Sequence, residues 1–266
     1  MKRHNWLILL MLAAMPATAA PGEVMELSPG ETATAHALMT GVMVIESERE
    51  SGTACPFDDL LLHEAGELQT ILPAEVRAGL IVQDGWTRPL QVWCSDQHWA
   101  LISFGDDGQQ GSDYVASLPT IDETGDDFLV FDGELVAAPG HVLEAMERGK
   151  QRRTMADMRS IGIVFEAYHL DNDAWPSQPV DKLEPIVKIE LAVQPIYIRS
   201  LPLKDAWGNA FVYWTDGESY RVVSSGKDGV FEADYTVEAG LGEITSDDPA
   251  RDIVFANGEY EQWPAF

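Results

Sequence analysis

The chain has 266 residues and carries 44 acidic against 17 basic side chains, which gives a formal net charge of −27. Nucleic acids and anionic membrane surfaces are bound through basic patches, so this charge argues against both classes of partner. It is compatible with divalent cations, with a basic protein partner, or with an acidic exported protein that uses its charge only for solubility.

The first twenty residues predict export. Lys2 and Arg3 form a positive start, residues 6–14 are mostly apolar, and Ala17-Thr-Ala19 offers a cleavage site of small residues. This order is typical of a signal peptide, and the apolar stretch is shorter than the roughly twenty residues of a membrane span. We therefore expect residues 1–20 to be removed and the mature protein to be periplasmic or secreted, with no membrane span. A retained membrane anchor is the alternative.

The chain has two cysteines, Cys55 and Cys94. An even number of cysteines in an exported protein favours a disulfide. A bridge between these two would stabilise the fold by about 3–4 kcal/mol through loop-closure entropy. Two buried free thiols are the alternative.

Part of the sequence occurs twice. Residues 84–108 and 205–229 align without a gap. The identical pairs are Asp84/Asp205, Trp86/Trp207, Trp93/Trp214, Ser103/Ser224, Gly105/Gly226, Asp107/Asp228 and Gly108/Gly229. Self-similarity at one long offset predicts two copies of one structural unit.

A helix is predicted near the start of each copy. Apolar residues at helical spacing indicate one helix over residues 32–49 and a second from Leu143 to about Leu170. The second helix ends at Asp171-Asn-Asp-Ala-Trp-Pro176, where turn-forming residues precede a proline. Ala137-Ala-Pro-Gly140 marks the expected boundary between the copies.

Strands are predicted after each helix. In the second copy, residues 211–214 and 220–224 flank an Asp-Gly turn, and residues 253–255 form a later strand. A long helix followed by antiparallel strands is an α+β unit. The expected organisation is thus a signal peptide over 1–20 and domains over 21–138 and 142–266.

Five groups of residues follow one another in the second copy: the helical segment 151–162 followed by Tyr168, Asp171-Asn172 and Trp175-Pro176; Leu201-Pro202; Asp205-Ala-Trp-Gly-Asn209; Ser224-Ser-Gly-Lys-Asp-Gly229; and Asp252-Ile253. In their kind and order these groups resemble the head domain of the major pseudopilin of type II secretion, protein G. The resemblance implies two tandem pseudopilin-head-like domains, each a long N-terminal helix packed on a small antiparallel sheet. The first of them is a degenerate copy.

The resemblance also implies a calcium site in the Ser-x-Gly-x-Asp-Gly loop. Calcium prefers carboxylate and carbonyl oxygens, about six to eight of them. The implied ligands in the second copy are the side chains of Asp228 and Asp252 and the carbonyls of Ser225 and Val230, with Asp247 and Asp248 as additional candidates. In the first copy they are Asp107, Asp126 or Asp127, and the carbonyls of Phe104 and Gln109. An ordinary Asp-Gly turn with solvated acids is the alternative.

The expected function follows from the resemblance and from its departures. A pseudopilin begins with a prepilin-peptidase site and a hydrophobic polymerising helix, and this sequence shows neither, so we do not expect an ordinary pseudopilus subunit. We expect an exported, non-enzymatic protein that acts in secretion-related assembly or protein binding, with protein partners of a secretion or envelope system and no nucleic acid. A hydrolase and a glycan-binding protein that uses Trp86 and Trp207 are the alternatives. The basic residues Arg148, 150–153 and Arg159 are either a solvated helix face or a docking site.

Overall fold

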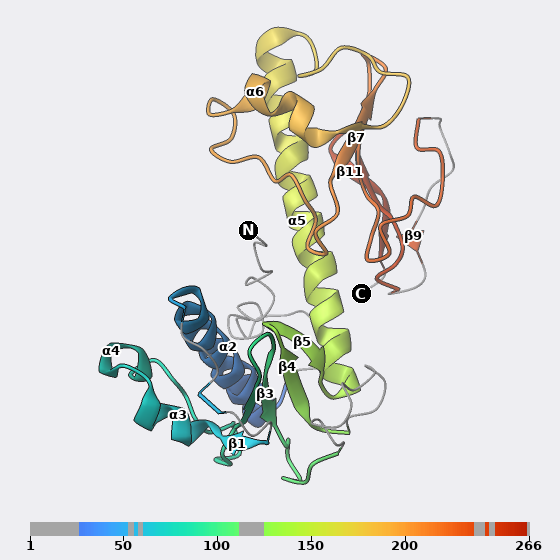
Figure 1. Ribbon diagram of the computed structural model, residues 1–266. Coiled ribbons are helices and arrows are strands. Elements are labelled where there is room, and N and C mark those ends of the chain that lie inside the picture. The colour runs from blue at the N-terminus through green and yellow to red at the C-terminus, as the bar shows by residue number, and fades with distance from the viewer. Residues whose placement is uncertain are drawn as a thin grey trace. The chain divides into compact units, whose positions relative to one another are not determined.

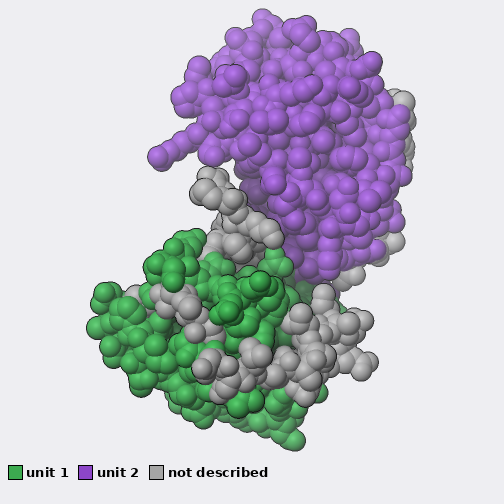
Figure 2. Space-filling view, in the orientation of Figure 1, with its two compact units in different colours: residues 1–146 green, residues 147–266 purple. Residues whose placement is uncertain are grey.

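The computed structural model describes residues 27–52, 56–57, 61–111, 125–236, 243–244 and 248–264. Its contacts divide the chain into two compact units, residues 1–146 and 147–266 (Figure 2). The predicted signal peptide over residues 1–20 lies outside the described residues. No helix in the described part of the chain combines the length and the apolar character that crossing a membrane requires.

Unit 1 opens with helix α2 (Pro29–Glu50), which confirms the predicted helix over 32–49. The helix begins earlier because Ser28 caps it. The Glu31 amide donates to Ser28 Oγ at 3.2 Å, and the Ser28 amide donates to Glu31 Oε2 at 2.7 Å. This reciprocal pair satisfies two donors at the helix start, and a proline occupies the first turn.

The sheet of unit 1 is antiparallel, with its strands paired in chain order. The strands are β1 (His63–Glu64), β2 (Gln91–Cys94), β3 (Trp99–Ser103), β4 (Phe128–Phe131) and β5 (Glu134–Ala137). Two short helices, α3 (Ala65–Ile71) and α4 (Ala74–Arg77), lie between β1 and β2 in the chain (Figure 1).

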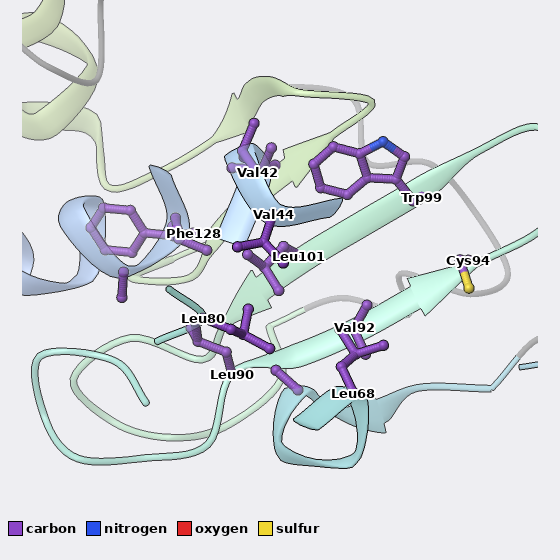
Figure 3. Packing of buried hydrophobic residues seen from close by; sticks show 14 of the residues in the cluster. Val42, Val44, Leu68, Leu80, Leu90, Val92, Cys94, Trp99, Leu101 and Phe128 are labelled. Carbon is purple, nitrogen blue, oxygen red and sulfur yellow. The ribbon is translucent and has the colours of Figure 1, made fainter. Parts of the chain in front are cut away.

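The core of unit 1 lies between α2 and one face of this sheet. Val42 of α2 packs with Leu101 of β3 and Phe128 of β4, and Leu68 of α3 closes the cluster beside Val92 (Figure 3). The opposite face carries a smaller apolar cluster that includes Ile102 and Leu129. Alternation along each strand therefore supplies apolar side chains to both faces.

Unit 2 begins within the long helix α5 (Gly140–Asn172), which confirms the helix predicted from Leu143 to about Leu170. Its sheet has the order β6-β7-β8-β10-β11-β9. The elements are β6 (Glu184–Pro185), η1 (Ile186–Ile189), α6 (Glu190–Val193), β7 (Val212–Thr215), β8 (Tyr220–Ser224), β9 (Glu243–Ile244), β10 (Ile253–Ala256) and β11 (Glu259–Pro264). All pairings are antiparallel except that of β9 with β11.

Helix α5 packs on the sheet of unit 2 through an apolar stripe of its own residues. Met158, Ile161 and Phe165 are fully buried and contact apolar residues of β7, β8 and β10. Gly162 lies against the ring of Phe255, where a β-carbon would collide. The glycine thus allows the helix to approach the strand closely.

The five strands of unit 1 correspond in order and antiparallel pairing to β6, β7, β8, β10 and β11 of unit 2, whereas β9 has no counterpart among the described residues of unit 1. Strands β1, β2 and β3 begin 121 residues before β6, β7 and β8, and β4 and β5 begin 125 residues before β10 and β11. The register agrees as well, because Ser103 pairs with Phe128 and Ser224 pairs with Ile253. Both units are α+β, with a helix on an antiparallel sheet (Figure 1).

Candidate functional site

A buried aspartate anchors the loop that follows β8. Asp205 Oδ2 accepts the hydroxyl of Ser224 at 2.7 Å, and Oδ1 accepts the amides of Trp207 at 3.1 Å and Asn209 at 2.8 Å. Burial raises the pKa of Asp205, and these hydrogen bonds oppose the rise without cancelling it. The side chain thus ties the entry of β7 to the end of β8.

Unit 1 contains the same arrangement. Asp84 Oδ2 accepts the hydroxyl of Ser103 at 2.7 Å, and Oδ1 accepts the amides of Trp86 and Arg88, both at 2.9 Å. These four residues stand 121 positions before their counterparts. The repeated residues therefore make the same set of hydrogen bonds in both units.

The loop of unit 2 turns at Gly226 and packs against the residues that precede β10. Gly226 has φ +62°, and a β-carbon there would lie 2.6 Å from the carbonyl oxygens of Ala250 and Arg251. The Lys227 amide donates to the Pro249 carbonyl at 2.8 Å. Only glycine fits this close approach, and it brings Ser225 and Asp228 beside the start of β10.

Asp252, at the start of β10, is the buried acid of this loop. Its Oδ2 accepts the Glu232 amide at 2.8 Å and the Tyr235 hydroxyl at 2.6 Å. Its Oδ1 is buried and has no hydrogen-bond partner among the described residues. Burial raises the pKa of Asp252 to about 6, and the negative charges of Glu232 and Asp228 add to the rise.

The other predicted ligands of unit 2 are placed differently. Asp228 and Asp248 are exposed, and their Oδ1 atoms accept the amides two residues ahead, each at 2.9 Å. Ser225 is buried, Val230 is exposed, and Asp247 lies outside the described residues. Within the described chain, no three His, Cys, Asp or Glu side chains converge as a metal site, so backbone carbonyls would have to supply ligands.

The loop of unit 1 places Asp107 and Asp127 as unit 2 places Asp228 and Asp252, and it adds bonds at Asp126 and Phe104. The Asp107 amide donates to Asp126 Oδ2 at 2.8 Å, and Asp107 Oδ1 accepts the Gln109 amide at 2.7 Å. The Phe104 carbonyl accepts the Gly108 amide at 2.9 Å. The buried Asp127 accepts the Gly111 amide at 2.7 Å, as Asp252 accepts that of Glu232.

Tyr235 is the site residue that the sequence prediction missed. It lies in the segment between the loop and β10, where no predicted element placed it. A signal was present, because Asp113-Tyr114 and Asp234-Tyr235 stand 121 residues apart, at the offset of the repeat. Tyr114 lies outside the described residues.

The two tryptophans considered for glycan binding are engaged within their own units. Trp207 donates its indole N–H to Glu147 at 2.7 Å, and the ring of Trp86 lies directly against Gly30. Both side chains are half-buried. This arrangement does not favour a stacking platform for sugars.

The basic residues of α5 form local contacts. Lys150 pairs with Glu147 at 3.1 Å, Arg153 with Asp157 at 3.6 Å, and Arg159 lies over the ring of Tyr260. A partly solvated helix face accounts for these contacts. Cys94 is buried at the end of β2, while Cys55 lies outside the described residues, so the disulfide stays a prediction.

A long helix on a small antiparallel sheet, followed by an Asp-Gly loop that leads to a buried aspartate, agrees with the architecture of a pseudopilin head. Residues 141–238 match the family model described as Type II secretion system (T2SS), protein G. The match runs from the start of α5 to just beyond Tyr235, and it supports a pseudopilin-like domain in the second half of the chain. No curated protein and no solved structure matches the chain.

Proposed function

We propose that the chain is an exported, non-enzymatic protein of two tandem pseudopilin-head-like domains, which binds protein partners in a type II secretion system. The family match over residues 141–238 carries the proposal. The shared strand order and the shared Asp-Ser anchor support extending it to unit 1. The acidic composition favours a basic surface on the partner.

We further propose that calcium stabilises the loop of unit 2. The residues present fit the ion. Asp252 has a buried oxygen, Oδ1, without a hydrogen-bond partner in the described chain, and Asp228 lies close enough for its negative charge to raise the pKa of Asp252. The Ser225 and Val230 carbonyls and Asp248 would complete the ligand set, with Asp247 from outside the described residues. A bound calcium ion would supply the positive charge that offsets burial of the Asp252 carboxylate.

The corresponding loop of unit 1 is a second candidate calcium site, and it has a positive charge beside it. Its ligands would be Asp107, Asp126 or Asp127, and the Phe104 and Gln109 carbonyls. Arg88 stands where unit 2 has Asn209, and its guanidinium donates to the Gly105 carbonyl. Because this cation lies at the loop, we expect unit 1 to bind calcium more weakly than unit 2.

A deletion of the gene in its native host tests the secretion role. We expect export of type II substrates to fall while proteins that cross only the inner membrane are exported normally. Restoring the wild-type gene should restore export. Unchanged export in the deletion strain, together with no cross-link to any type II component in intact cells, would reject the proposal.

A further inference from the structure

We propose that Tyr235 is a positioning residue of the calcium site, which occupies one oxygen of Asp252 so that the other is presented to the ion. The inference rests on the calcium site proposed above. It concerns the segment 231–236, whose residues are not among the ligands that the family resemblance implies.

The hydrogen bonds at Asp252 are unequal between its two oxygens. The Tyr235 hydroxyl and the Glu232 amide both donate to Oδ2, at 2.6 and 2.8 Å. Oδ1 is buried and has no hydrogen-bond partner in the described chain. Two donors on one oxygen fix the rotation of the carboxylate, because any partial rotation would break both hydrogen bonds. The free oxygen is thereby held in one orientation, as second-shell groups hold metal ligands elsewhere.

Tyr235 is itself firmly held. Its side chain is 1% exposed and packs with Val223 of β8 and Val254 of β10 on the face of the sheet opposite α5. The Tyr235 carbonyl accepts Arg221 Nη1 at 3.2 Å, and Arg221 Nε pairs with Glu261 at 2.7 Å. The hydroxyl therefore reaches Asp252 from a fixed ring rather than from a mobile loop.

The sequence repeat carries the same tyrosine. Tyr235 follows Asp228 by seven residues, and Tyr114 follows Asp107 by seven residues. The amide bond to the buried aspartate also recurs, from Gly111 to Asp127 in unit 1 and from Glu232 to Asp252 in unit 2. A residue needed only to fill apolar space could be any large hydrophobe, whereas this spacing retains a hydroxyl in both copies.

Calcium titration of Tyr235→Phe by calorimetry tests the inference. Phenylalanine keeps the ring and the packing and removes only the hydroxyl. We expect the calcium Kd of the loop in unit 2 to rise about tenfold, the lower end of the range for second-shell changes. Tyr213→Phe is the matched control, because Tyr213 is equally buried and its hydroxyl bonds to Ser177 at 2.9 Å, a residue outside the site. Its Kd should equal that of the wild type.

Infrared spectra provide a readout that loss of packing would not change. The carboxylate stretch of bound Asp252, assigned by difference from Asp252→Asn, should shift in Tyr235→Phe towards coordination by both oxygens. A Tyr235→Phe protein with wild-type Kd and spectrum would overturn the inference while leaving the calcium site intact. A wild-type protein that binds no calcium would overturn both. A Tyr235→Phe protein that does not fold would also overturn the inference, because the hydroxyl would then serve the fold.

Discussion

The two units hold the loop after their third strand with the same hydrogen bonds but place different side chains against it. In both, a buried aspartate holds a serine and two amides, and a glycine with positive φ lies against the residues before the next strand. The side chain that donates to the loop carbonyl differs between the units: it is Arg88 in unit 1, bonded to Gly105, and Asn209 in unit 2, bonded to Gly226. The repeat therefore defines a loop scaffold, and the charge of the side chain at this position distinguishes the two units.

The two units also share a hydrogen bond that attaches the helix to the strand entry. Thr34 of α2 accepts the Gly85 amide at 2.9 Å, and Thr154 of α5 accepts the Ala206 amide at 3.1 Å. Each bond joins a buried helix hydroxyl to the residue after the anchoring aspartate. The helix, the strand entry and the loop are therefore connected through one short stretch of chain in each unit.

The largest effect is expected from removing the anchoring aspartate. Asp205→Ala leaves two amides and a buried hydroxyl without their acceptor, so we expect unit 2 to lose about 3 kcal/mol of stability. Asp84→Ala should cost unit 1 a similar amount, because its bonds are the same. Hydrogen–deuterium exchange resolved by peptide measures each unit separately. A loss of stability below about 1 kcal/mol in either variant would show that the two aspartates do not play equivalent roles.

A pH effect should distinguish the buried acid of unit 2 when calcium is chelated. The pKa of Asp252 is raised to about 6 in the fold, so the unfolded chain ionises this group first. The stabilisation from the neutral acid is fully present below about pH 4 and is lost as the pH rises through about 6. The shift corresponds to on the order of 2–3 kcal/mol. Urea denaturation at pH 5 and pH 7 should show about half of this difference in the wild type, on the order of 1 kcal/mol, because part of the group has already ionised at pH 5. Asp252→Asn should show much less of it.

The helix attachment should contribute less. Thr154→Val keeps the shape of the side chain and leaves the Ala206 amide without its acceptor, which should cost about 1–2 kcal/mol. Thr34→Val should cost unit 1 about the same. Exchange rates of the amides at Gly85 and Ala206 report each loss directly. Unchanged protection at Ala206 in Thr154→Val would show that the bond does not stabilise the loop.

The smallest effect is expected at the helix glycines. Gly162→Ala forces a β-carbon into the Phe255 ring, whereas Gly41→Ala meets only the flexible end of Leu101. We expect Gly162→Ala to destabilise unit 2 by about 0.5–1 kcal/mol, because the gain in helix propensity offsets part of the clash, and Gly41→Ala to be near neutral. Gly149 of α5 has open space around it, so Gly149→Ala should stabilise the helix by about 0.5–1 kcal/mol. Thermal unfolding measures all three, and equal effects at Gly162 and Gly149 would contradict the packing.

Much of the fold was predictable from the sequence because its signals are local. Apolar spacing located α2 and α5 to within three residues at each end, and the Asp-Gly turn located β7 and β8 to within one. The short edge strands β1 and β6 were not predicted, because a strand of two residues is too short to show alternation of apolar and polar side chains. Their existence depends on the strand beside them.

The candidate site was predictable only in part. Asp228 and Asp252 follow from the motifs, but burial of the second and exposure of the first depend on how the loop packs against residues 249–251. The bond from Tyr235 joins residues 17 positions apart across an irregular segment. No periodicity reports such a bond, and only the repeat offset indicates that the tyrosine belongs to the site.

Thermal melting with calcium and with chelator tests the central claim that calcium binds the loop of unit 2. A ligand held only by the folded state stabilises it, by about 2.7 kcal/mol at one hundred times its Kd. We expect calcium to raise the melting temperature of the wild type and of Asp107→Ala, and to raise that of Asp252→Asn much less, because only the weaker candidate site of unit 1 remains in that variant. A wild-type protein whose melting temperature is the same in calcium and in chelator would contradict the account.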